Sequence, residues 1–188
     1  MALSMYASRR LYVKQWWHDG ADERYTVRIE RGGKPVKGIR EDRISFVDVE
    51  VQDWFKANHI HAWFVDNVQN GVDDCGSYPI TSENLIKLLA VCEEVIEASV
   101  LVNGSIEVGE VWNSELNTGE ATRKPGRVID DPKVASELLP TREGAFFGSC
   151  EYDGDYLYDV YDTRDWAKRM IEDHKNGVPG ELYYHSTW

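Results

Sequence analysis

The 188-residue chain is poor in cysteine and in long apolar runs, and each shortage excludes a class of protein. Its three cysteines, Cys75, Cys92 and Cys150, are an odd number without metal-ligand or disulfide-framework spacing, which favours a reducing compartment. No stretch approaches the roughly 18 apolar residues of a membrane span, and the first residues lack an apolar signal-peptide core. We therefore expect a cytoplasmic protein with no membrane partner.

The sequence also lacks the motifs that mark common catalytic and cofactor sites. It contains no Walker loop, no Gly-x-Gly-x-x-Gly, no Gly-x-Ser-x-Gly and no His-Glu-x-x-His. Its composition, 42% hydrophobic and 29% charged with 7 Trp, 10 Tyr and 5 Phe, is sufficient for a globular core. We expect a single domain over residues 1–188, with no cofactor and no metal.

Basic residues are scarce over most of the chain. Asp and Glu number 33 against 21 Lys and Arg, for a net charge of −12. Residues 1–43 hold ten basic and six acidic residues, net +4, so the remainder carries −16. An acidic chain is repelled by phosphate backbones, so nucleic-acid binding by the whole surface is not expected, although a local basic patch is left open. The carboxylates also admit mimicry of nucleic acid toward a partner's basic groove.

The hydrophobic pattern predicts an α+β fold, a small and mostly antiparallel sheet packed against three main helices. The expected helices cover residues 51–68, 81–101, 131–140 and, starting at 155 or 159, up to 175. The expected strands cover 11–13, 25–29, 44–49, 146–147 and 181–187. Two further features are a basic N-terminal hairpin region over 1–43 and a protruding hairpin over 105–129, whose polar tip spans 113–124.

Two polar residues stand on the apolar face of the first predicted helix. Asn58 and His61 are three residues apart, inside a stripe that includes Trp54, Ala62 and Val65. Buried polar groups need partners, so the pair is either a satisfied structural element or a site that contacts a ligand. His59 and His61 point about 200° apart on a helix, which excludes a shared metal ion.

Two other segments carry chemistry. Asp73, Asp74 and Cys75 form a short loop that either closes as an Asx turn or supplies a small hydrolase, with His61 as the base. The segment 140–149 has glycines that let the backbone approach a ligand. Its candidate ligand-binding residues, which join Asn58 and His61, are Arg142, Phe147 and Ser149.

The C-terminal part interleaves carboxylates with tyrosines. Aromatic side chains carry much of the energy of protein interfaces, and carboxylates provide orientation and association rate. We therefore expect a protein-binding face, whose candidate residues are Tyr152, Asp153, Asp155, Tyr156 and Asp159.

Four segments taken together resemble a family of small bacteriophage and prophage accessory proteins of unknown biochemistry. They read WFKANHIHAWFV from Trp54, NGVDDCG from Asn70, LLPT from Leu138, and FFGS from Phe146 with Tyr152-Asp153 following. The resemblance runs with gaps from about Val51 to Tyr184, and members commonly have a basic residue where Phe55 stands. It implies a phage accessory protein but supplies no reaction.

The sequence favours a phage-encoded protein of the host cytoplasm that binds and inhibits a host defence protein or complex without catalysis, as an anti-CRISPR-like or other anti-defence inhibitor. The first alternative is a nucleotide or signalling-nucleotide binding protein that uses the 140–149 segment. The second is a small hydrolase that uses His61 with Asp73, Asp74 or Cys75. Exposed tyrosines leave a homodimer open.

Overall fold

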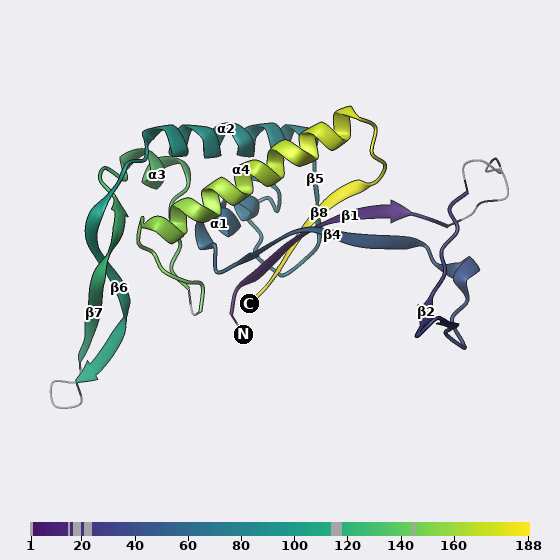
Figure 1. Cartoon of the computed structure of the whole chain (residues 1–188), viewed down its shortest axis with the longest axis horizontal. Coiled ribbons are helices and arrows are strands. Elements are labelled where there is room, and N and C mark those ends of the chain that lie inside the picture. The colour runs from purple at the N-terminus through teal and green to yellow at the C-terminus, as the bar shows by residue number, and fades with distance from the viewer. Residues whose placement is uncertain (1, 15, 17–19, 21–23, 114–117, 145) are drawn as a thin grey trace.

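The computed structural model describes residues 2–14, 16, 20, 24–113, 118–144 and 146–188, and it confirms the α+β fold (Figure 1). A four-stranded antiparallel sheet has the order β4-β1-β8-β5. Its strands are β1 (Ser4–Tyr12), β4 (Phe46–Phe55), β5 (Tyr78–Ile80) and β8 (Glu181–Thr187). The helices are α1 (Asn58–Asn67), α2 (Ser82–Ala98), α3 (Lys133–Leu138) and α4 (Gly154–Lys175).

One face of this sheet carries the core. Met5 and Ala7 of β1 are buried, whereas Ser4 and Tyr6, which alternate with them, are only half-buried, which is the two-residue period of a strand with one covered face. Phe64 of α1 stacks on Tyr184 of β8, with ring centroids 4.0 Å apart. The helices therefore cover the face that holds these residues.

The first predicted helix was wrong in its N-terminal part. Residues 51–55 belong to β4, which pairs with β1 so that Trp54 lies opposite Met5. Within these residues Trp54 is buried and Phe55 is exposed. Lys56 then adopts a positive φ of 61°, and α1 begins at Asn58. The apolar residues of a half-buried strand and of the helix after it together imitate helical spacing, so local periodicity placed the boundary too early.

The structure confirms the helices predicted from 81 and up to 175, which are α2 and α4. Local capping explains where each one starts. Thr81 caps α2: its hydroxyl accepts from the Asn84 N–H at 3.1 Å, and the Asn84 side chain accepts from the Thr81 N–H at 2.9 Å. The side chain of Asp153 accepts from the N–H groups of Asp155 and Tyr156, so α4 begins at Gly154. Cys92 of α2 is buried in the core.

The segment 1–43 is not one peripheral hairpin region. Its first part is β1, an interior strand of the sheet, while β2 (Glu30–Arg31) and β3 (Lys34–Pro35) form a ribbon in a separate lobe. Gly32 and Gly33 make the turn with φ of 60° and 71°, a conformation that glycine adopts without strain. The strand predicted over 25–29 was wrong. Pairing between β2 and β3 starts only at Glu30, opposite Pro35. The short helix η2 (Glu41–Arg43) follows in the same lobe.

The protruding hairpin is present and longer than expected. Strands β6 (Leu101–Asn113) and β7 (Thr118–Ile129) pair along their whole length, so the hairpin begins at Leu101, where the predicted helix was expected to end. This arm projects from one end of the molecule, and the lobe with β2 lies at the other end (Figure 1). Most of the predicted tip at 113–124 is therefore ladder, and residues 114–117 lie outside the described residues. None of the helices that the structure describes is long and apolar enough to cross a membrane.

Candidate functional site

Asn58, the first residue of α1, holds the 140–149 segment against the body of the protein. Its side-chain nitrogen donates to the carbonyl oxygens of Ser149 at 2.8 Å and Phe147 at 3.3 Å. Its side-chain oxygen accepts from the Arg142 N–H at 2.9 Å. The structure therefore brings together four of the predicted ligand-binding residues, but the carboxamide of Asn58 is occupied by the backbone of its own chain.

The predicted short strand at 146–147 was wrong. The Phe147 N–H donates to the carbonyl of Gly144, which closes a turn, and Phe146 adopts a φ of 66°. A side chain at Gly148 would lie 2.5 Å from the carbonyl oxygen of Lys56, so only glycine allows the loop to approach the body this closely. Tight turns, and not pairing between strands, explain the Gly-flanked aromatic sequence.

His61 occupies the centre of a buried hydrogen-bonded chain. Its Nε2 lies 3.1 Å from an Asp73 carboxylate oxygen, and its Nδ1 lies 2.7 Å from the Tyr184 hydroxyl. An ionised carboxylate only accepts, so Nε2 carries the proton and Nδ1 accepts from Tyr184. Burial lowers the pKa of His61, and the Asp73 carboxylate partly opposes that shift. The Trp188 indole donates to the other Asp73 oxygen at 3.0 Å, so the chain ties α1 to β8 and to the last residue.

The geometry gives His61 a partner for the hydrolase alternative but no open reaction site. Asp73 does meet His61, as that alternative requires. The His61 side chain is fully buried and both ring nitrogens are bonded. Asp74 accepts from the Gly76 N–H at 2.8 Å, which confirms the Asx turn, and Cys75 lies on the surface. Arg142 contacts Asp66 at 3.5 Å on the outside.

A second group of predicted site residues lies where β4 ends and α4 begins. A cavity of about 340 Å³ opens there, and Asp153, Asp155, Tyr156 and Asp159 line it. These are four of the five residues predicted for protein binding, and Tyr152 packs edge-on against Tyr156 with ring centroids 5.0 Å apart. Asp153 and Tyr156 are buried, one as the helix cap and the other in the core, so Asp155 and Asp159 supply the accessible charge.

The side chains that line the cavity carry more negative than positive charge. Burial, together with repulsion from the neighbouring Asp155, Asp162 and Asp153, raises the pKa of Asp159 to about 7. Burial also raises the pKa of Asp153, which its hydrogen bonds to backbone N–H groups oppose. Glu151 lines the same cavity and is paired with Arg123 of the arm at 3.0 Å. A cationic group that entered would reduce the repulsion.

Three exposed aromatic side chains surround this region, and sequence reasoning missed their role. Phe55 and Tyr158 line the acidic cavity with 61% and 69% of their surface exposed. Phe146, 70% exposed, lines an adjoining cavity of about 660 Å³, which shares Lys56 and Ser149 with the first. We call these two cavities and their three aromatics the acidic aromatic face. The helix predicted over 51–68 included Phe55, so its position at the exposed end of β4 was not predicted.

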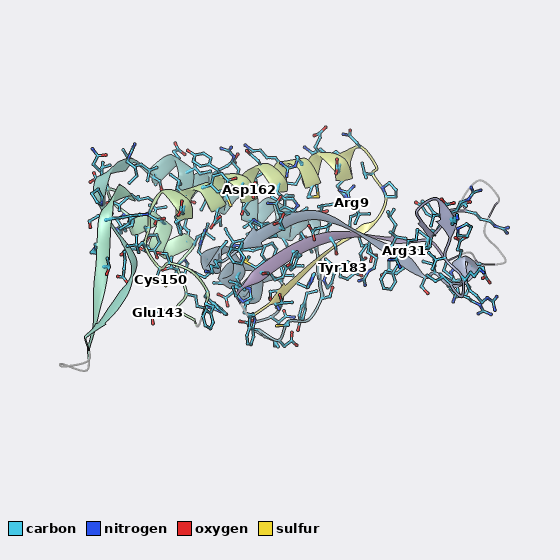
Figure 2. All side chains as sticks on the ribbon, turned by 60° about the horizontal axis from the view of Figure 1, so that its bottom comes forward. Arg9, Arg31, Glu143, Cys150, Asp162 and Tyr183 are labelled. Carbon is cyan, nitrogen blue, oxygen red and sulfur yellow. The ribbon has the colours of Figure 1, made fainter. Side chains whose placement is uncertain are left out.

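Figure 2 shows Glu143 and Cys150 toward the end of the molecule that carries the arm, with Arg31 in the opposite lobe. The acidic aromatic face and the basic residues of 24–43 therefore lie at different ends. Among the described residues, no group of three or more His, Cys, Asp or Glu side chains is arranged to hold a metal ion. Comparison with protein-family models, with curated proteins and with solved structures gives no significant match.

Proposed function

We propose that this chain is a binding protein that acts without catalysis, and that its acidic aromatic face docks on a basic surface of a partner protein. The observation that carries the proposal is the gathering of Phe55, Tyr158 and Phe146 around two adjoining cavities rich in carboxylates. Exposed aromatic anchors beside pockets are typical of the energetic centre of an interface. Single exposed aromatics are ordinary, but three that border continuous hollows are not scattered.

The resemblance to phage accessory proteins supports a partner from a host defence system. Such a partner handles nucleic acid or nucleotides through basic surfaces in many cases, and a face of carboxylates complements a basic surface. Association through this face would then be fast at low salt and would weaken as salt screens the charges.

The nucleotide alternative requires Asn58, His61, Arg142 and the Phe147 loop to lie within contact distance of one another, and they do. The donors and acceptors it requires are nevertheless bonded within the chain. We therefore assign Asn58 and His61 to holding the loop and the C-terminal strand in place. The same loop presents Phe146, so the two residues support the acidic aromatic face from behind.

The test compares the partners that the tagged chain captures from a defence-positive host lysate. A variant with Phe55→Ala, Phe146→Ala and Tyr158→Ala removes the aromatic anchors. The matched control is Ile86→Ala, since Ile86 of α2 is 59% exposed and lines neither cavity. All three substituted residues are exposed, so both variants should keep the wild-type circular dichroism spectrum and melting temperature.

We expect host proteins that wild type and the control retain and the triple variant loses. Expression of the wild type or the control should raise phage plating on the defence-positive host, and the triple variant should not. Equal capture and equal plating by the triple variant would overturn the proposal.

A further inference from the structure

The lining of the acidic cavity includes a buried side chain with an unpartnered polar atom. His59 lines the cavity, is 3% exposed and packs at a tilt against Tyr156, with ring centroids 4.1 Å apart. Its Nε2 has no hydrogen-bond partner. Burial lowers the pKa of His59 to about 3, so the ring is neutral at neutral pH. A buried nitrogen left without a partner is costly, and a ligand that bonds to it would relieve that cost.

The charge around His59 specifies the sign of the ligand. Asp153, Asp155 and Asp159 line the cavity, and within the part of the chain that the structure describes neither Asp155 nor Asp159 has an ion-pair partner. Lys56 is the basic residue of the lining, and its ammonium group lies 5.2 Å from the centre of the Phe55 ring. The carboxylates therefore favour an incoming cation.

We infer that this cavity recognises a guanidinium group and, resting on the proposed function, we assign that group to an arginine side chain of the partner protein. A guanidinium is planar, offers five N–H donors and stacks on aromatic rings. These properties match the carboxylates of Asp155 and Asp159, the unpartnered nitrogen of His59 and the exposed ring of Tyr158. An ammonium ion is a compact, strongly hydrated charge that uses the aromatic wall less well.

The test uses nuclear magnetic resonance of the ¹⁵N-labelled full chain, titrated with N-acetyl-arginine amide at about pH 8, where Asp159, with its pKa of about 7, is ionised. The neutral N-acetyl-citrulline amide has nearly the same shape and controls for charge. The readouts are the ring ¹⁵N shift of His59 and the amide shifts of Gly154 and Asp155. Asp159→Asn removes a carboxylate of the cavity, and Asp165→Asn is the matched control, since Asp165 is an exposed residue of the same helix that pairs with Arg164.

We expect saturable shifts at His59 with the arginine amide and none with the citrulline amide. Asp159→Asn should weaken the arginine affinity by at least about tenfold, whereas Asp165→Asn should change it by less than about twofold. Equal shifts with both amides, no shift with arginine, or unchanged affinity in Asp159→Asn would overturn the inference. Capture of partners without arginine binding overturns this inference alone, and arginine binding without capture overturns the proposed function alone.

Discussion

The side-chain nitrogen of Asn58 donates to the carbonyl oxygen of Ser149 at 2.8 Å, across 91 residues of sequence. This bond, with those to Phe147 and Arg142, fixes the loop that presents Phe146 on the acidic aromatic face. A residue that looked like a ligand contact in the sequence therefore builds a surface from the inside.

Replacement of Asn58 should free the loop. Asn58→Asp keeps the shape but turns a donor into an acceptor that faces two carbonyl oxygens, so we expect a loss of about 1–3 kcal/mol in the free energy of unfolding. Hydrogen exchange at Arg142, whose N–H donates to Asn58, should accelerate more than exchange in α2. Unchanged stability and exchange would show that the bonds to the loop contribute nothing.

Removal of His61 should destabilise the protein through Tyr184. His61→Ala leaves the buried Tyr184 hydroxyl without its acceptor and opens a cavity, for which we expect a loss of about 3 kcal/mol. Urea denaturation measures it. The control is His174→Ala, an exposed residue near the end of α4, with an expected change below about 0.5 kcal/mol. A loss no larger than that of the control would contradict the role of His61 in the buried chain.

The pKa of Asp159 predicts how stability depends on pH. Folding raises this pKa from 3.8 to about 7, so between these values the folded chain keeps a proton that the unfolded chain releases. The contribution of Asp159 to the free energy of unfolding therefore falls as pH rises through that window. The neutral Asp159→Asn variant lacks this penalty, so it should be more stable than wild type at about pH 8, with a smaller difference at about pH 5.

His59 has the opposite dependence, because its pKa is lowered to about 3 and stability is lost as pH falls below 6.5. Wild type and Asp159→Asn both contain His59, so its contribution to the free energy of unfolding cancels in the difference between them. Thermal melts across this pH range measure that difference. A difference that does not change with pH would show that Asp159 is ionised in the folded protein as freely as in the unfolded chain.

Salt should distinguish the charged part of the face from its aromatic part. Once a partner is captured, its association rate should fall as ionic strength rises, because screening weakens the attraction of the carboxylates. The Tyr158→Ala variant should instead raise the dissociation rate, since it removes an exposed aromatic ring that the partner would bury. Surface plasmon resonance at two salt concentrations measures both rates. An association rate independent of salt would contradict a charge-complementary interface.

Local signals predicted the fold where structure is local. The amphipathic spacing and the cap at Thr81 predicted α2, and alternation predicted β8, because both signals lie within a few consecutive residues. The extent of β4 depends on pairing with β1, for example Trp54 opposite Met5, and no local period records that contact. Residues 146–147 turn because Gly148 must approach Lys56, a contact equally invisible in the sequence.

In the candidate site, too, local spacing predicted positions but not the contacts with distant parts of the sequence. The inward position of Asn58 and His61 was predictable from helical spacing, and the structure confirms it. Their partners, Ser149 and Tyr184, are 91 and 123 residues away, so the occupation of their polar atoms was not. The exposure of Phe55 and Tyr158 depends on where β4 ends beside α4. An acidic aromatic segment was visible in the sequence, but its cavity was not.

The most direct test of the central claim places a photo-crosslinking phenylalanine analogue at Tyr158 in the chain expressed in a defence-positive host. A second chain carries the analogue at Ile86, which is exposed on α2 outside both cavities. We predict that irradiation joins the chain to a specific host protein from Tyr158 and not from Ile86. Adducts from Ile86 alone, or no adduct from either position, would contradict the assignment of the acidic aromatic face as the docking surface.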